Sequence, residues 1–195
     1  MYRKAVEFRL PEWIDPFLKK RPDYFPKREE RMRLVIELAK TNVFEKTGGP
    51  FAAAIFDDSD GRLISPGVNM VTTTNQSIAH AEMVAIMQAQ FRLSTFDLGG
   101  PDMPSCELVT STAPCAMCLG AVPWSGVRSL VCGARDEDAR SIGFDEGSKR
   151  TDWVEELEKR RIKVYNDMCR EEAVEVLKSY VEQGGVIYNG RTQKN

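Results

Sequence analysis

Two short fragments of the sequence combine residue types that can bind a metal ion. The fragment "HAE" places His80 two residues before Glu82, and His80 is the single histidine of the 195-residue chain. The fragment "PCAMC" places Cys115 three residues before Cys118. Each fragment alone is a weak signal, because a lone histidine is more often a hydrogen-bonded residue and a Cys-x-x-Cys pair can serve in redox chemistry. Together they offer one imidazole and two thiolates to the same ion.

Zinc matches this set of donors. It accepts imidazole nitrogen and thiolate sulfur, and a catalytic zinc has three protein ligands and an open fourth position. Cys115 and Cys118 stand at i and i+3 in the first turn of a predicted helix, where they face the same side and the positive helix end favours thiolates. We therefore expect one zinc ion per chain, bound by His80, Cys115 and Cys118.

Glu82 is predicted to carry a proton. Zinc lowers the pKa of a bound water from 15.7 to roughly 7, and a nearby carboxylate can take that proton and deliver it to a leaving amine. H-x-E followed by P-C-x-x-C is the signature of zinc deaminases that act on nucleobases, and its glutamate is not a ligand. A glutamate in the first turn of a helix is also commonly an exposed residue that the helix dipole stabilises.

The other three cysteines offer no fourth ligand with a paired spacing. Cys106, Cys132 and Cys169 lie in or beside predicted elements, where we expect them to be small buried side chains. Five cysteines are an odd number at low density, which argues against a disulfide framework. A zinc module without enzymatic activity, closed by a fourth side chain from a partner, is an alternative that would not need Glu82.

Alternating strands and helices must position these residues. The segments with strand character are 51–57, 62–69, 106–111, 128–134 and 162–166. Helical spacing begins at Lys27 and stops before Gly48, and returns at 79–93, in the segment "CAMCLGAV" and at 170–183. This alternation predicts an α/β domain with a central sheet of about five strands and helices on both faces.

The chain length and its prolines suggest one domain with an N-terminal arm. Residues 1–26 contain four prolines with interleaved aromatic residues, which indicates an irregular arm packed on the body. Residues 27–195 are then a single deaminase domain with a C-terminal tail, since a chain of this size can bury one sizeable core.

Charge and hydropathy exclude several classes of protein. The net charge of −2 gives no overall reason to bind a phosphate backbone, so we do not expect a nucleic-acid partner. The N-terminus has no apolar stretch of signal-peptide length, and the longest apolar run, "FAAAIF", is far too short to span a bilayer. We expect a cytoplasmic protein without a membrane partner.

The chain resembles the cytidine deaminase-like superfamily, in its branch of guanine deaminases and tRNA adenosine deaminases. The resemblance runs from about Arg28 to the C-terminal tail and rests on "GGPFAAAIF", "GVN", "AHAEMVAI", "PCAMCLGAVPWSGVRSLV" and "IGFDEG". It implies a three-layer α/β/α fold. The segments "GGPFAAA", "WSGVRSLV" and "GFDEG" look most like the small zinc-dependent guanine deaminases of bacteria. The implied reaction is hydrolysis of guanine, a purine base, to xanthine and ammonia by a zinc-activated water with Glu82 as proton carrier.

The resemblance also implies contacts with the substrate. Asn69 would hydrogen-bond the purine, the backbone amide of Ala81 would bind the substrate, and Phe51 and Trp124 would form walls of the site. Glu146 would be a second catalytic carboxylate, because an ionised carboxylate can accept protons from both N1–H and the exocyclic amine of guanine.

Several features around this implied site stay open. Asp145 competes with Glu146 for the same role, Phe144 can stack on the base or pack into the core, and a charged pair before glycine is by itself typical of a solvated turn. Ala113 stands where this branch commonly has an acidic residue, so the contacts of that acid are in doubt. The resemblance further implies a homodimer, in which the segment around Tyr188 could reach the neighbouring active site.

Deamination of another ring is the main alternative. A tRNA adenosine deaminase shares nearly all the zinc chemistry, and Lys149, Arg150 and residues 159–161 could form a local cationic surface, although such stretches are more often solvated helix faces. A deaminase of cytosine, cytidine, guanosine or an aminotriazine is a further alternative, because the shape of the site and not the metal motif selects the ring.

Overall fold

The computed structural model describes residues 8–190, so residues 1–7 of the predicted arm and 191–195 of the predicted tail lie outside the described residues. One mixed sheet has the strand order β2-β1-β3-β4-β5. Its strands are β1 (Ala52–Asp57), β2 (Leu63–Val68), β3 (Cys106–Thr112), β4 (Ser129–Ala134) and β5 (Lys163–Tyr165). β1 pairs antiparallel with β2 and β3, whereas β3, β4 and β5 are parallel. The five predicted strands are confirmed.

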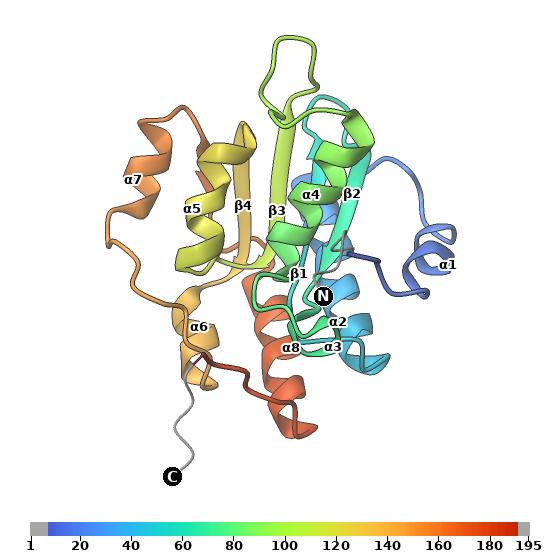
Figure 1. Ribbon diagram of the computed structural model, residues 1–195, viewed down its shortest axis with the longest axis vertical. Coiled ribbons are helices and arrows are strands. Elements are labelled where there is room, and N and C mark those ends of the chain that lie inside the picture. Colours follow the sequence, from blue (N-terminus) through green and yellow to red (C-terminus); the bar gives the residue numbers. More distant parts are fainter. Residues whose placement is uncertain (1–7, 191–195) are drawn as a thin grey trace, which may run out of the picture.

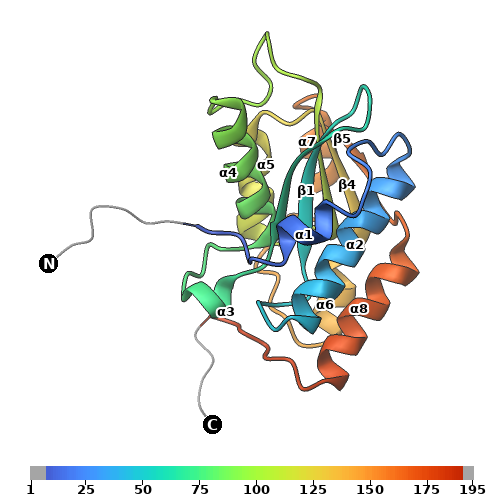
Figure 2. The ribbon, with the colours of Figure 1, turned by 90° about the vertical axis from the view of Figure 1, so that its right-hand side faces the viewer.

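Helices cover both faces of this sheet, which gives the three layers that Figures 1 and 2 show. One face carries α2 (Arg28–Phe44), α6 (Asp136–Ser141) and α8 (Arg170–Glu182). The other face carries α4 (Ala81–Leu93), α5 (Ala116–Ser125) and α7 (Trp153–Glu158). The predicted α/β/α class is therefore confirmed. No helix in the described part of the chain is both long and apolar enough to cross a membrane.

Strand β1 is buried on both sides because it lies between two helical layers. Ala54 and Phe56 belong to the core shared with α2 and α8, whereas Ala53 and Ile55 belong to the core shared with α4 and α5. Side chains alternate between the faces of a strand, so a central strand between two layers has no polar face and appears in the sequence as the continuous apolar run "FAAAIF".

Four short helices have no counterpart among the predicted elements. They are α1 (Ile14–Leu18), α3 (Val71–Thr74), α6 and α7. Each is at most six residues long, too short to display helical periodicity. The helix expected at 79–93 begins instead at Ala81, with His80 in extended conformation as its N-cap.

The described part of the N-terminal segment packs on the same core as α2. Ile14 and Phe25 are buried there, and the indole Nε1–H of Trp13 donates to the Thr47 hydroxyl at 2.9 Å, just beyond the end of α2. The N-terminal segment is thus bonded to Thr47, next to the Gly48–Gly49–Pro50 turn that leads into β1.

A buried ion cluster joins α2 to the first residues of β3. The carboxylate of Glu107 is fully buried and accepts hydrogen bonds from Arg31 Nη1 at 2.7 Å, Arg28 Nε at 2.7 Å and the Ser129 hydroxyl at 3.0 Å. A buried carboxylate needs such partners, because an unpaired charge in the interior is strongly destabilising. The cluster fixes α2 at the N-terminal end of β3. The C-terminal end of β3 lies at the opposite end of the sheet.

Candidate active site

The candidate active site forms where β2 and β3 end and β1 begins. β1 is antiparallel to both neighbours, so its N-terminal end lies beside the C-terminal ends of β2 and β3. This end of the sheet carries Phe51 before β1, Asn69 after β2 and Thr112 at the end of β3. The Asn69 N–H donates to the Phe51 carbonyl at 2.9 Å, which closes this end. Helices α4 and α5 both begin near it, so their N-terminal ends point toward the same place.

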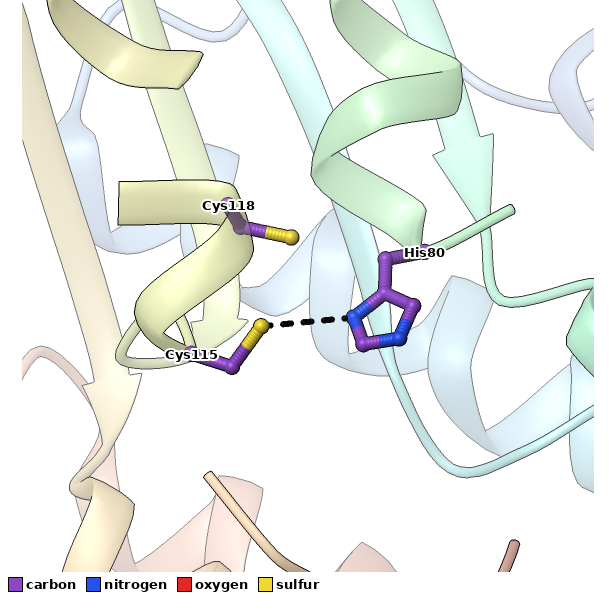
Figure 3. A group of neighbouring side chains, drawn as sticks. All are labelled: His80, Cys115 and Cys118. Carbon is purple, nitrogen blue, oxygen red and sulfur yellow. Dashed lines mark hydrogen bonds between the residues drawn. The ribbon is translucent and has the colours of Figure 1, made fainter. Parts of the chain in front are cut away.

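The three predicted metal ligands meet between these two helix starts. His80 is the N-cap of α4, Cys115 is the N-cap of α5, and Cys118 lies in the first turn of α5. Figure 3 shows the three side chains pointing into a common space. Their ligand atoms all lie within 4.8 Å of one another, and Cys115 Sγ is 3.5 Å from His80 Nδ1. Ligand atoms of a tetrahedral zinc with nitrogen and sulfur donors are roughly 3.6–3.8 Å apart, so the cluster fits zinc with little movement.

The ionisation of this cluster also favours a cation. A hydrogen bond from the Cys118 thiol, supported by His80, lowers the pKa of Cys115 to about 4, while the bond to Cys115 and burial raise the pKa of Cys118. Burial disfavours the imidazolium of His80, but the neighbouring Cys115 and Glu82 outweigh it and raise the pKa of His80. A divalent metal that displaces these protons would stabilise both thiolates.

Two buried carboxyl groups stand beside the ligands. Glu82, at the second position of α4, is 6% exposed, and burial together with the Cys115 charge raises its pKa to about 7. Glu146 is also 6% exposed, and burial followed by the charges of Cys115 and Glu82 raises its pKa to about 8. Carboxyl groups with pKa values near neutrality are suited to proton transfer.

A cavity of about 180 Å³ connects these groups. It brings together most of the residues singled out in the sequence: Phe51, Asn69, His80, Glu82, Ala113, Cys115, Phe144, Asp145, Glu146 and Tyr188. Cys118 is buried behind the lining, and Ala81 is buried at the first position of α4, where a helix leaves its N–H groups without intrahelical acceptors. The cavity is small beside the roughly 300–1,000 Å³ of sites for drug-sized ligands.

The segment "GFDEG" reaches the cavity because it is bonded to the start of α5. The Ala116 N–H donates to the Glu146 carbonyl at 2.9 Å, and Lys149 Nζ donates to the Pro114 carbonyl at 3.0 Å. The Lys149 side chain is only 5% exposed. These bonds turn the Glu146 carboxyl inward, whereas the exposed Asp145 carboxylate accepts a bond from the Gly147 N–H at the surface.

Aromatic side chains form one wall of the cavity. Phe144 makes edge contacts with Phe51 at a centroid distance of 4.9 Å and with Tyr188 at 5.2 Å. Phe144 therefore lines the cavity and packs into the core at once. Tyr188 lies in the cavity of its own chain, and its buried hydroxyl has no hydrogen-bond partner among the described residues.

Trp124 does not line this cavity in the chain. It is 86% exposed near the end of α5 and lines a different groove together with Trp153. The helical position explains this, because Trp124 stands on the side of α5 that faces away from the sheet. Thr110, Thr112 and Asn189 also line the cavity, and no pattern in the sequence marks them, since only the pairing of distant segments brings them here.

Comparison with known proteins places the zinc motifs in a family context. Residues 26–134 match the family described as the cytidine and deoxycytidylate deaminase zinc-binding region. The guanine deaminase of Bacillus subtilis is 36% identical over 137 residues, which cover 70% of this chain and 83% of that protein.

Two further relatives are named for different reactions. A solved structure of guanine deaminase from Nitrosomonas europaea superposes with a TM-score of 0.87 at 43% identity, over 92% of this chain and 98% of that chain. A tRNA-specific adenosine deaminase of Aquifex aeolicus is 34% identical over 110 residues, which cover 56% of this chain and 68% of that protein.

Substitution of one ligand is expected to remove the metal. Cys118→Ser should lower the zinc content of the dialysed protein from about one ion per chain to near zero, because it leaves only two of the three ligands of a catalytic zinc site. Atomic emission on the purified protein measures this content, and circular dichroism reports the fold.

Cys132→Ser is the matched control, since Cys132 is a buried thiol of β4 outside the cluster. It should keep its zinc. Equal loss of zinc from both variants would contradict the assignment of the ligands.

Proposed function

The chain belongs to the family of cytidine and deoxycytidylate deaminases with their shared zinc-binding region, and we propose that it hydrolyses guanine to xanthine and ammonia. The observation that carries the proposal is the presence of two buried carboxyl groups in the lining of one small cavity. Glu82 adjoins the ligand cluster, and Glu146 comes from the "GFDEG" segment. The similarity to guanine deaminases along most of the chain supports this choice of ring.

His80, Cys115 and Cys118 hold the zinc ion in this proposal. When bound, zinc supplies a Lewis acid that lowers the pKa of a coordinated water to about 7. The three ligands come from two helix starts, whose dipoles stabilise negative charge at the thiolates. A catalytic rather than structural site fits the donor count, because the ligand cluster among the described residues has three side chains, with Glu82 beside it.

Glu82 transfers the proton during hydrolysis. Burial raises the pKa of its carboxyl group to about 7, and this desolvation favours the uptake of a proton. As the carboxylate it accepts a proton from the water that attacks C2 of guanine. The attack opens the C2=N3 double bond. As the acid, Glu82 donates that proton to the exocyclic amine, which leaves as ammonia when the C2–N bond breaks. The C2=N3 bond re-forms, and the resulting 2-hydroxy tautomer becomes xanthine when its hydroxyl proton moves to N3.

Glu146, Asn69 and the aromatic wall select the ring. The Glu146 carboxylate accepts hydrogen bonds from N1–H and the exocyclic amine of guanine, a pattern that adenine lacks. Neutralisation of the Cys115 charge by a metal removes the second cause of the raised pKa of Glu146, so the carboxyl group ionises more readily. Asn69 and the Ala81 amide hydrogen-bond the purine, Phe51 and Phe144 pack against it, and Asp145 stands at the rim.

Modification of tRNA is less well supported by the surface. Arg150 pairs with Asp152 at 2.7 Å, Lys159 and Arg160 both pair with Glu156, and Lys149 is buried. Four of the five cations are therefore paired or buried, and the exposed Arg161 alone does not form the basic patch that phosphate binding requires.

A homodimer is part of the proposal. Phe91, Phe96 and Trp124 are 84%, 87% and 86% exposed. Leu98 N–H donates to the Ser125 carbonyl at 2.9 Å, so the segment after α4 lies against the end of α5, and the three aromatic residues belong to one end of this layer. Large exposed apolar groups at one end of a layer are candidates for a protein interface.

The remaining parts of the proposal concern organisation and location. Residues 27–195 act as one deaminase domain, and residues 8–26, the described part of the N-terminal arm, pack on it, which the burial of Ile14 and Phe25 supports. The cytoplasm is the proposed compartment, since none of the five cysteines forms a disulfide, as is usual in a reducing environment.

A panel of bases tests the reaction and the role of Glu146 together. Zinc-loaded protein should release ammonia from guanine with xanthine as product, and kcat/KM for adenine, cytosine, cytidine, guanosine and an aminotriazine should be at least a hundredfold lower. Glu146→Gln should lose about a hundredfold or more of kcat/KM for guanine, because the amide presents a donor where the ring needs an acceptor.

Asp145→Asn is the matched control and should change kcat/KM less than about threefold, since its carboxylate is exposed. Ammonia release from another base in place of guanine would discard the assignment of the ring. An equal loss in the two variants would discard the role of Glu146.

The oligomeric state is measured by light scattering. The expected mass is twice the 22.0 kDa of one chain, and Trp124→Glu should shift it toward 22.0 kDa. Phe44→Glu, which changes a residue 77% exposed at the end of α2 on the other face, should leave the mass unchanged. A wild-type mass of a single chain contradicts the dimer.

A further inference from the structure

A fully buried amide connects α2 to the loops that border the cavity. Asn42 is 0% exposed in the last turns of α2. Its Nδ2 donates to the Gly49 carbonyl at 2.9 Å and to the Asn69 carbonyl at 2.9 Å, and its Oδ1 accepts a bond from the Thr47 hydroxyl at 2.7 Å. Both protons of the amide are therefore used on the two loops.

Trp13 determines which way this amide points. The indole N–H can only donate, and it donates to the Thr47 hydroxyl at 2.9 Å. Thr47 therefore accepts from Trp13 and spends its own proton on Asn42 Oδ1. A reversed amide would place its oxygen against two carbonyl oxygens, so the chain of bonds from Trp13 to Asn42 permits one orientation.

Asn69 depends on this arrangement for its position. It is 1% exposed, its Oδ1 accepts a bond from the Val71 N–H at 3.2 Å, and its backbone carbonyl accepts the Asn42 bond. Among the residues that the structure describes, no acceptor binds Asn69 Nδ2, and Asn69 lines the cavity. Its free amide protons are thus available to a ligand, and the backbone that carries them is held by Asn42.

The approach of the two loops is close enough to require glycine. A Cβ atom at Gly48 would lie 1.7 Å from the Asn69 carbonyl oxygen and 2.9 Å from Asn42 Nδ2. The backbone of the Gly48–Gly49 turn therefore touches Asn69 directly, and the Asn42 amide occupies the remaining space.

We propose that Asn42 is a positioning residue for the purine, and that the hydrogen-bonded chain Trp13–Thr47–Asn42 sets the geometry of Asn69. The inference rests on the proposed function, because it takes Asn69 to bind the base. It gives the segment before α2 a role in substrate binding, although that segment does not contact the cavity. A purely structural role for the same bonds would change stability and leave the affinity for the base unaltered.

Thr47→Val tests the inference with little change in volume. The substitution removes the donor to Asn42 Oδ1 and the acceptor of Trp13 Nε1. We expect KM for guanine to rise about five- to tenfold, which is the scale of one lost hydrogen bond, with kcat within about threefold and zinc content unchanged. Thr41→Val is the matched control and should change neither constant, because within residues 8–190 the Thr41 hydroxyl bonds only to the Glu37 carbonyl of its own helix.

A double-mutant cycle with Asn69→Ala separates positioning from general loosening. The readout is the dissociation constant of 8-azaguanine, measured by calorimetry on zinc-loaded proteins, so that no variant needs to turn over substrate. Thr47→Val should weaken binding about five- to tenfold in the wild-type background and less than about twofold in the Asn69→Ala background, because interacting residues give non-additive effects.

Equal factors in the two backgrounds would overturn the positioning role. Trp13→Phe is a second variant that removes the indole N–H and keeps the edge contact with Phe17, at 5.6 Å, and it should show the same coupling. A wild-type protein that neither deaminates guanine nor binds 8-azaguanine overturns the proposed function. An active wild type with additive effects overturns this inference alone.

Discussion

The site depends on one electrostatic constraint: negative charge is buried in a small space with few cations. Cys115 and Cys118 can both become thiolates there, and the carboxyl groups of Glu82 and Glu146 are each 6% exposed. Burial, with the Cys115 charge as the next cause, raises the pKa of both carboxyl groups. A divalent cation among the three ligands relieves this repulsion, and it brings both carboxyl groups next to the place where a proton must move.

The fold creates this charge density by bringing the ends of several helices and strands together. Helices α4 and α5 begin at the same end of the sheet, so their dipoles favour the anionic ligands. The antiparallel β1 lets residues before one strand and after another meet there. Glu146 arrives from a loop that is bonded to the backbone of residues 114 and 116, so the position of the second carboxyl group is tied to that of the metal ligands.

Local patterns in the sequence predicted the parts of the site that depend on local geometry. A spacing of three residues at a helix start puts Cys115 and Cys118 on one face, and the alternation of apolar segments gives the five strands. The resemblance, and not the residues themselves, favoured Glu146, and the structure now shows its carboxyl group turned inward and that of Asp145 at the surface. Ala113 lines the cavity and is 5% exposed, so no acidic group acts at that position.

Contacts between segments far apart in the chain could not be predicted from the sequence. Trp124 carries an aromatic side chain at a plausible spacing, yet the rotation of α5 turns it away from the cavity. Tyr188 lies in the cavity of its own chain because the segment after α8 returns to Phe144. The bonds of Asn42 to Asn69 and of Lys149 to Pro114 span 27 and 35 residues, and no periodicity encodes them.

The central claim is that Glu82 carries the proton and does not bind the metal, and Glu82→Gln tests it most directly. Glutamine keeps the shape of the side chain and cannot take up a proton. The variant should keep about one zinc per chain and the wild-type fold, and its kcat for guanine should fall about a thousandfold, within the range of general acid–base catalysis. Glu171→Gln, which changes an exposed glutamate in the first turn of α8, should retain full activity. Loss of zinc from the Glu82 variant, or a kcat close to that of the wild type, would contradict the account.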